Sequence, residues 1–343
     1  MNGIKIDAQH LNLVQDDQIR MFLEQWWNDE LVVEVKTSGS TGTPKTILLE
    51  KKKMLASAAM TISYFNLKKN TRALLCLPTQ YIAGKLMLVR AMLGEWDLIS
   101  VEPSSNPLEK INESEHFGFC AMTPMQVSRI LSDPASKIKL ENIDQLIIGG
   151  GETSAELIRQ IQPVKTKCYS TYGMTETITH VAIQKLNGED KSEVFSLMKG
   201  VNAYTDERNC LVIEAAHLSD EKIVTNDLVE FVDFKKFKWL GRYDNIINSG
   251  GIKLVPEELE KQIAPLLNDR RFYLCGAADV ELGQKLILVV EGPQPDSTTT
   301  SLLLNHLRES MGKNNAPREI RSLNSFMLTE TGKIKRILPE KNT

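Results

Sequence analysis

Between residues 45 and 185 the sequence alternates short apolar runs with segments of helical spacing. The apolar runs, which read as strands, are Arg72–Pro78, Asp97–Glu102, Phe117–Met122, Gln145–Ile148 and Lys167–Ser170. The segments with helical spacing are Met54–Tyr64, Ala83–Leu93, Met125–Leu131 and Ala155–Ile161. Such an alternation is typical of parallel strands, because a helix must carry the chain back before the next strand can start. The pattern predicts an α/β fold with a large, mostly parallel sheet covered by helices.

The pattern changes between residues 190 and 240. Three short strands separated by turn residues are expected at Cys210–Ala215, Lys222–Thr225 and Val229–Val232. This part of the chain predicts a more antiparallel, barrel-like β piece attached to the large N-terminal domain.

A second change falls at Gly241-Arg242-Tyr243-Asp244. After it, Asn245–Val255 reads as strand–turn–strand, and Pro256 opens a helix over 257–267 with acids in its first turn. Two strands, a helix around 301–311 and a last strand near 320–328 follow. We therefore expect two domains, a large one over residues 1–243 and a small α+β one over 244–343.

Composition narrows the function. The 343 residues are 42% hydrophobic and 25% charged with a net charge of −3. Because this composition does not indicate a basic face, no nucleic-acid partner is expected. No run approaches the length of a membrane span, and the N-terminus does not resemble a signal peptide, so a cytoplasmic protein is expected. The five cysteines are scattered without C-x-x-C, which favours buried, reduced thiols over metal or disulfide roles.

A glycine- and hydroxyl-rich segment, Thr37-Ser38-Gly39-Ser40-Thr41-Gly42-Thr43-Pro44-Lys45, lies between two strand-like runs, Leu31–Val35 and Thr46–Glu50. Glycines allow the backbone to approach an anion, hydroxyls donate hydrogen bonds and the lysine adds a positive charge, so the segment predicts phosphate binding. A Walker A loop is excluded, because Pro44 stands where that pattern needs its second glycine and a helix should follow.

Two further clusters follow strands. Ser170–Thr177 presents an aromatic ring, Tyr172, and a carboxylate, Glu176, which suit base stacking and Mg²⁺ between phosphates. A strand end with a surface acid is the alternative. The triplet Gly149-Gly150-Gly151, before Glu152, stands where open α/β sheets bind ligands, although a tight turn would explain it equally.

Three weaker candidates lie further along the chain. Asp227 could bind a ribose diol or be a structural acid, and Arg242 with Asp244 could form a hinge or a surface ion pair. The segment Thr331-Gly332-Lys333 has the charge of an ordinary solvated tail.

In this order, these pieces resemble the motifs of the adenylate-forming superfamily of acyl- and aryl-CoA synthetases, luciferases and nonribosomal adenylation domains. Thr37–Lys45 is similar to its phosphate loop and Tyr172–Glu176 to its Y-G-x-T-E motif. Gly241–Asp244 is similar to its hinge motif, and Thr331–Lys333 to the motif of its catalytic lysine.

The resemblance implies a two-step reaction. A carboxylate attacks the α-phosphate of Mg·ATP and forms an acyl-adenylate with release of pyrophosphate. A thiol, usually that of CoA, then displaces AMP. A mobile C-terminal domain, pivoting at Asp244, would serve the two half-reactions in turn.

The resemblance also implies a role for each matched residue. Lys333, Glu176 and Thr41 would be catalytic, the last two holding Mg²⁺, while Gly250 and Gly251 would contact CoA. The ATP and AMP contacts would come from Thr37, Ser38, Gly39, Ser40, Thr41, Gly42, Lys45, Gly150, Gly151, Glu152, Tyr172, Gly173, Thr175, Asp227 and Arg242. The acyl substrate would contact Tyr81, Lys85 and Gly149.

Two features depart from the family pattern. Only 36 residues precede the phosphate loop, so most of the usual N-terminal subdomain is expected to be missing. In Leu77–Lys85, which resembles the family's L-P-x-x-H-x-x-G, Tyr81 replaces the histidine and Lys85 follows the glycine. The cation at Lys85 would suit a second anionic group, although a solvent-facing lysine is the alternative.

These details are most similar to superfamily members that activate an aromatic keto-diacid, a small carboxylic acid, with ATP and CoA as co-substrates. Another aryl- or fatty-acyl-CoA ligase and a non-catalytic adenylate- or acyl-binding protein remain as alternatives. The sequence leaves the oligomeric state open.

Overall fold

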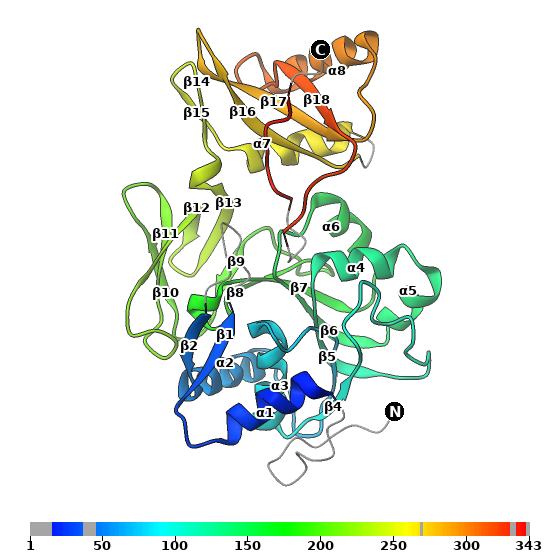
Figure 1. The fold of residues 1–343 in the computed structure, drawn as a ribbon, viewed down its shortest axis with the longest axis vertical. Coiled ribbons are helices and arrows are strands. Elements are labelled where there is room, and N and C mark those ends of the chain that lie inside the picture. The colour runs from blue at the N-terminus through cyan, green and yellow to red at the C-terminus, as the bar shows by residue number, and fades with distance from the viewer. Residues whose placement is uncertain (1–15, 37–45, 268–269, 330–333, 341–343) are drawn as a thin grey trace. The chain divides into compact units, whose positions relative to one another are not determined.

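The computed structural model describes residues 16–36, 46–267, 270–329 and 334–340, and its chain divides into two compact units (Figure 1). The second unit comprises 204–212, 224–231 and 238–343, and the remaining residues form the first. The strands β10 (Asn202–Thr205), β11 (Cys210–Glu214) and β12 (Ile223–Asp233) therefore run through both units. The domain boundary after residue 243 stays a prediction.

The first unit is built on the mostly parallel sheet expected from the alternating pattern. Five strands pair in parallel in the order β4-β3-β5-β6-β7. They are β3 (Arg72–Leu75), β4 (Asp97–Ser100), β5 (Phe117–Met122), β6 (Ile143–Ile148) and β7 (Lys167–Gly173). The mixed α/β fold class is confirmed.

Helices cover both faces of this sheet. The helices α2 (Lys51–Tyr64) and α3 (Ile82–Gly94) lie on one face and pack against each other. After these two helices, the rings of Phe65 and Trp96 contact Phe119 of β5 with centroids 5.5 and 5.6 Å away. The other face packs against α4 (Pro124–Leu131), α5 (Pro134–Leu140) and α6 (Ala155–Ile161), which lie together in Figure 1. Two covered faces explain why these strands read as continuous apolar runs.

Antiparallel strands extend the sheet beyond β7. The strands β8 (His180–Lys185), β9 (Phe195–Leu197) and β13 (Lys236–Arg242) add to it in that order, and β12, β11 and β10 follow. The two strands expected at 222–225 and 229–232 are one strand, β12, so that detail was wrong. The polar residues at the expected break are held by cross-strand bonds: Thr225 Oγ1 donates to Leu211 O at 2.8 Å, and Asn226 Oδ1 accepts from Arg208 at 2.9 Å.

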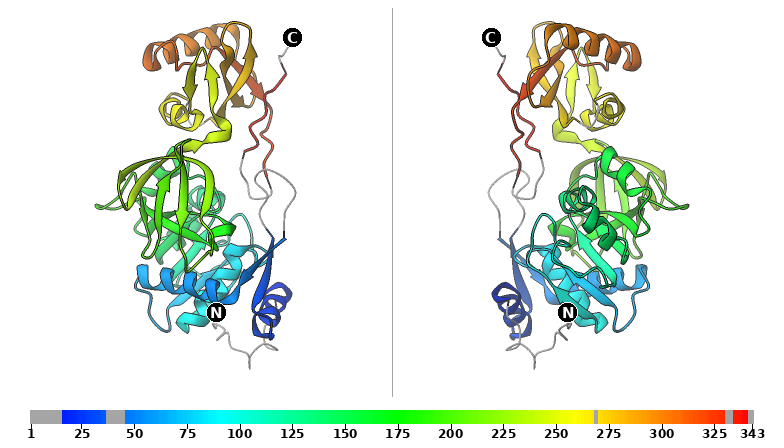
Figure 2. Two further views of the ribbon diagram at one scale, coloured as in Figure 1. Left: turned by 90° about the vertical axis from the view of Figure 1, so that its left-hand side faces the viewer. Right: turned by 90° about the vertical axis from the view of Figure 1, so that its right-hand side faces the viewer.

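A separate two-stranded pair, β1 (Val32–Lys36) and β2 (Thr46–Glu50), is antiparallel, with Lys36 opposite Thr46. Helix α1 (Asp17–Trp27), which the sequence reading did not predict, precedes it, and both can be followed in Figure 2. The strands expected on either side of the glycine- and hydroxyl-rich segment are therefore present.

The second unit contains a five-stranded sheet whose principal order is β15-β14-β17-β16, with β18 parallel to β17. Its strands are β14 (Ile247–Ser249), β15 (Ile252–Leu254), β16 (Phe272–Asp279), β17 (Gly283–Glu291) and β18 (Glu319–Leu323). Helices α7 (Pro256–Ile263) and α8 (Ser297–Met311) bury Leu259, Ile263 and Leu307 against one face of it. The expected hairpin at 245–255 is present as β14 and β15.

All five cysteines are free, and four of them are buried while Cys275 is half-buried. Burial raises the pKa of Cys168 to about 12, so this thiol stays protonated and inert. Among the described residues, no three His, Cys, Asp or Glu side chains gather as a metal-binding group. No helix within the described ranges is long and apolar enough to cross a membrane.

Candidate functional site

The Y-G-x-T-E motif begins at the end of β7. The Tyr172 ring is half-buried and makes edge contacts with Phe237 and Phe195, with centroids 5.4 and 5.9 Å away. The register of β7 against β8 shifts between Tyr172 and Gly173. A Cβ at Gly173 would lie 2.3 Å from Thr179 O and 2.5 Å from His180 Cα, so only glycine fits this close approach. Tyr172 is thus held by packing on a rigid strand end.

The short 3₁₀ turn Thr175–Thr177 carries Glu176 as an exposed carboxylate. In the described part of the chain, no hydrogen bond or ion pair engages this carboxylate, and its exposure suits a metal ion between phosphates. The next residue but one, Ile178, has φ 64° and ψ −58°, and Thr179 N–H donates to Thr177 O at 2.7 Å. This is a strained γ-turn, rare for a β-branched residue, and such strain clusters at functional sites.

The glycine triplet lies beside this motif. Strands β6 and β7 are parallel neighbours with Ile148 opposite Ser170, so Gly149–Gly151 and Tyr172 follow adjacent strand ends. Thr171 Oγ1 donates to Ile148 O at 3.2 Å, and a Cβ at Gly149 would lie only 2.4 Å from that hydroxyl oxygen. Gly150 has φ +82°, which favours glycine, and Glu152 is exposed. Two of the predicted clusters are therefore brought together at one edge of the sheet.

Helix α3 carries a buried cation that the sequence reading missed. The Arg90 side chain is 2% exposed, and its Nη2 donates to Thr179 Oγ1 at 3.3 Å, directly after the γ-turn. Among the described residues, Arg90 forms no ion pair with a carboxylate, and its Nε has no hydrogen-bond partner. Burial lowers the pKa of Arg90 to about 9. A charged side chain within the apolar stretch Leu86–Ala91 was the sequence signal that could have revealed it.

The predicted acyl-site residues lie at the start of the same helix. Tyr81 is the N-cap residue of α3, and a Cβ at Gly84 would lie 2.4 Å from Pro78 O, which explains this glycine. Lys85 is buried, at 7% exposure, with Nζ 4.9 Å from the centre of the Phe22 ring. Burial lowers the pKa of Lys85, while Glu34 opposes the shift. The solvent-facing alternative for Lys85 is therefore wrong.

Asp227, Arg242 and Asp244 form one network within the second unit. Arg242 Nη1 lies 3.5 Å from Asp227 Oδ1, and its Nη2 lies 3.4 Å from Asp244 Oδ2. Asn226 Nδ2 also donates to Asp244 Oδ2 at 3.1 Å. The structure thus brings together the residues predicted for ribose binding and for the hinge. Asp227 is 7% exposed, as a carboxylate with fixed donors should be.

Two predicted segments fall outside the described residues: Thr37, Ser38, Gly39, Ser40, Thr41, Gly42 and Lys45 of the phosphate loop, and Lys333. Residues on both sides of the second are held in place, because Leu328 pairs with Ile334 and Lys335 N–H donates to Met327 O at 2.9 Å. Gly250 and Gly251, at the turn of the β14–β15 hairpin, have φ +59° and +82°. Both values favour glycine, so the hairpin alone explains these two residues.

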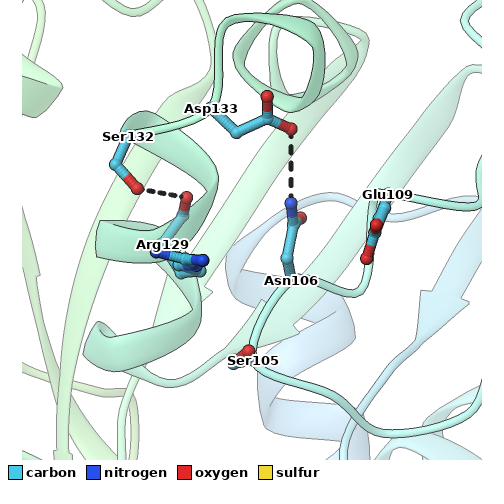
Figure 3. Close-up of a pocket in the computed structure, with 6 residues that line it drawn as sticks. All are labelled: Ser105, Asn106, Glu109, Arg129, Ser132 and Asp133. Atoms are coloured by element: carbon cyan, nitrogen blue, oxygen red, sulfur yellow. Dashed lines mark hydrogen bonds between the residues drawn. The ribbon is translucent and has the colours of Figure 1, made fainter.

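A polar cavity of about 360 Å³ lies elsewhere in the first unit (Figure 3). Its lining residues are Ser105, Asn106, Glu109, Arg129, Ser132 and Asp133. Asn106 Nδ2 donates to Asp133 at 3.4 Å, and Ser132 Oγ donates to Arg129 O at 2.8 Å. None of the predicted site residues lines this cavity.

The mostly parallel sheet, with a glycine-rich turn and the Y-G-x-T-E motif at adjacent strand ends, is the architecture of a nucleotide-binding α/β enzyme. The family model described as AMP-binding enzyme matches residues 10–203, and the chain belongs to that family. This result confirms the family resemblance predicted from the motifs.

Similar proteins narrow the class. An acyl-CoA synthetase (AMP-forming)/AMP-acid ligase II-like protein from Dyadobacter fermentans is 36% identical, with a TM-score of 0.67, and the match covers 96% of this chain and 97% of that one. A probable 2-succinylbenzoate–CoA ligase from Mycobacterium tuberculosis H37Rv is 25% identical over 330 residues, 90% of this chain and 84% of the relative. The o-succinylbenzoate–CoA synthetase of Bacillus subtilis, solved with ATP and magnesium, shares the fold at 17% identity and a TM-score of 0.74, over 88% of this chain and 68% of its own.

Proposed function

We propose that the chain is an ATP-dependent acid–CoA ligase that converts 2-succinylbenzoate to its CoA thioester. Relatives with this function, among them the Mycobacterium tuberculosis ligase, support the reaction and the substrate. The single observation that supports this choice of substrate is the buried guanidinium of Arg90, next to the Y-G-x-T-E motif. A substrate with two carboxylates can be activated at one and held by this cation at the other.

In the first half-reaction an oxygen of the substrate carboxylate attacks the α-phosphorus of ATP. The bond to the bridging oxygen breaks and pyrophosphate leaves with that electron pair. Lys333 neutralises the charge that develops on the α-phosphate and carboxylate oxygens, and the Thr37–Lys45 segment holds the β- and γ-phosphates. Loss of one such preorganised donor typically costs roughly 10²–10³ in rate.

The nucleotide is held at both ends. Tyr172 stacks on the adenine beside Gly149–Gly151, and Asp227 with Arg242 binds the ribose. A magnesium ion, when bound, neutralises phosphate charge. The exposed Glu176 fits such an ion because Mg²⁺ takes one or two carboxylates together with phosphates and water.

In the second half-reaction the sulfur of CoA attacks the acyl carbon, and AMP leaves. Removal of Lys333 by rotation at Asp244 would open the site for the thiol, near Gly250 and Gly251. The two glycines also have the structural explanation given above, so their role toward CoA needs its own test.

A pyrophosphate-release assay with ATP, Mg²⁺ and a panel of carboxylic acids, with and without CoA, tests the proposal. We expect turnover with 2-succinylbenzoate and little with acids that carry one carboxylate. Turnover confined to monocarboxylates contradicts the substrate and supports another aryl- or fatty-acyl-CoA ligase. No turnover with any acid supports a non-catalytic adenylate- or acyl-binding protein.

The variant Arg90→Met tests whether the guanidinium of Arg90 binds the second carboxylate of the substrate. Because a hydrogen bond to a charged group contributes about 1.5–3 kcal/mol, kcat/KM for the diacid should fall roughly 10–100-fold. Two analogues of 2-succinylbenzoate, each lacking one of its two carboxyl groups, are the matched monocarboxylic substrates. An equal loss with the diacid and with the analogue that turns over would remove Arg90 from substrate recognition.

A further inference from the structure

A chain of buried hydrogen bonds runs from Arg90 through three elements of the first unit. Arg90 Nη2 donates to Thr179 Oγ1 at 3.3 Å, and Thr179 Oγ1 lies 3.2 Å from His180 Nδ1. His180 Nε2 lies 3.1 Å from Thr61 Oγ1 of α2, which donates to Ser57 O at 3.2 Å. Arg90, His180 and Thr61 are 2%, 3% and 0% exposed, so water is largely excluded.

The direction of every bond in this chain follows from its two ends. A carbonyl oxygen only accepts hydrogen bonds, so the Thr61 hydroxyl donates its hydrogen to Ser57 O. The Thr61 oxygen must then accept a hydrogen bond from His180 Nε2–H. A neutral imidazole protonated at Nε2 presents a lone pair at Nδ1, which accepts a hydrogen bond from the Thr179 hydroxyl. The Thr179 oxygen then accepts from Arg90, which only donates. The five groups are therefore consistent with one polarity and one tautomer.

The backbone connects this series of hydrogen bonds to the Y-G-x-T-E motif. Gly173 of the motif packs against Thr179 O and His180 Cα so closely that no side chain fits there. The γ-turn at Ile178 places the Thr179 hydroxyl between Arg90 and His180. Burial lowers the pKa of His180 well below its ordinary value, and the nearby charge of Arg90 adds to the shift, so the imidazole is neutral near pH 7.

We propose that Thr179 and His180 are positioning residues that hold the Arg90 guanidinium, and that through it they set the preference for an acid with a second carboxylate. The proposal rests on the proposed function. Arg90 has four side-chain torsions to fix, and Met87 Sδ, 3.7 Å from Nη1, is its other hydrogen-bond acceptor within the described residues. Thr179 is therefore the one oxygen atom in the described ranges that accepts a hydrogen bond from the guanidinium.

Thr179→Val removes the acceptor with little change in shape. We expect kcat/KM for the diacid to fall roughly tenfold, with a much smaller change for the monocarboxylic analogue that the enzyme accepts. KM for ATP should stay unchanged. His180→Gln, which loses the acceptor at the Nδ1 position, should behave in the same way, and His180→Asn, whose Oδ1 stands near Nδ1, should recover part of the preference.

Thr166→Val is the matched control, since Thr166 is 1% exposed and its hydroxyl donates to Leu140 O at 2.6 Å. It removes an equally buried threonine hydroxyl and should leave the ratio between diacid and analogue unchanged. If Thr179→Val and His180→Gln lower the diacid and the analogue by the same factor, the two residues are structural and the proposal is wrong.

The tautomer of His180 gives a readout that does not depend on turnover. In ¹⁵N spectra of the full chain, with the His180 signals assigned by their loss in His180→Gln, we expect a neutral ring protonated at Nε2 and a shift of the Nδ1 signal in Thr179→Val. A ring protonated at Nδ1 would overturn the positioning role. A wild-type chain that shows the expected tautomer but does not prefer diacids would instead overturn the proposed substrate.

Discussion

The indole Nε1 of Trp239 donates a hydrogen bond to Asp227 Oδ1 at 3.2 Å. Arg242 Nη1 lies 3.5 Å from the same oxygen, so two donors from one segment fix the carboxylate proposed to bind ribose. A carboxylate held in this way is oriented before the nucleotide arrives, which reduces the ordering cost of binding.

Trp239→Phe should therefore weaken ATP binding without affecting the acid. The phenyl ring keeps an aromatic face toward Lys261, whose Nζ lies 5.8 Å from the centre of the Trp239 ring, but it lacks the N–H donor. We expect KM for ATP to rise roughly fivefold, about 1 kcal/mol, with KM for the acid unchanged. Initial-rate kinetics measure both constants, with Trp27→Phe on the surface of α1 as the control. An equal rise in both KM values would contradict a role specific to the nucleotide.

Arg336 anchors the segment that follows Lys333. Its Nη2 lies 2.8 Å from Glu260 Oε2, and Nη1 pairs with the other carboxylate oxygen and donates to Leu274 O at 3.1 Å. Burial raises the pKa of Glu260, although Arg336 opposes the shift. Breaking such a largely buried pair leaves an uncompensated carboxylate, at a cost of up to about 3 kcal/mol.

Arg336→Met should lower the free energy of unfolding by about this amount and slow pyrophosphate release, because the segment that follows Lys333 loses its anchor. Urea unfolding and the adenylation assay measure the two effects. Adding Glu260→Gln should recover part of the stability, since it removes the unpaired charge and keeps the acceptor for Leu274 N–H, 2.6 Å away. Arg271→Met, which removes an exposed partner of Glu291, is the control and should cost less than about 1 kcal/mol.

The sequence predicted the features that local patterns encode. The strand β5 and the helix α6 were predicted with the bounds that the structure gives, because apolar period and turn residues determine such elements. The Gly149–Gly151 and Tyr172 clusters were each predicted at the end of a strand, and parallel pairing of β6 and β7 does place them at one edge. The family followed from the order of the motifs, which needs no coordinates.

The network around Arg90 could not be predicted in the same way. Its members, Thr61, Arg90 and Thr179, lie far apart in the sequence, and each is an ordinary polar residue until the packing of α2, α3 and β8 joins them. The merged strand β12 has a similar cause. Asn226 and Asp227 read as a turn, but side chains from neighbouring segments satisfy them within a strand.

Asp244→Pro should mostly block the second half-reaction. Asp244 lies in the 3₁₀ turn Tyr243–Asn245, where φ is close to the value that proline requires, so the ring fixes φ at this residue and opposes rotation there. Proline also disfavours helical ψ at Tyr243 and removes the carboxylate that Asn226 and Arg242 contact. Asp244→Ala, which loses the same contacts without fixing φ, is the control for the lost carboxylate. Single-turnover measurements separate adenylation from thioester formation, and a proline variant with both steps intact would argue against a required rotation.

The neutral state of His180 predicts how stability depends on pH. Its pKa in the folded chain lies well below the ordinary 6.5, because the ring is buried and Arg90 repels a second positive charge. Once the pH falls below about 6.5, His180 therefore binds a proton in the unfolded chain but stays neutral in the folded chain, and this difference favours unfolding. Above that pH both states are neutral at this position, and the residue has no effect on the pH dependence.

We expect the free energy of unfolding to fall with decreasing pH below about 6.5, with His180 contributing up to about 1.4 kcal/mol per pH unit. His180→Gln cannot take up this proton, so its profile should be flatter over the same range, whatever the absolute stability of the variant. Denaturant unfolding of both proteins at pH 7.5, 6.5, 5.5 and 5.0, values chosen to bracket the ordinary histidine pKa of about 6.5, measures the difference in slope. Parallel profiles for the two proteins would show that His180 accepts its proton equally in both states, and would remove the basis for a neutral ring between Thr61 and Thr179.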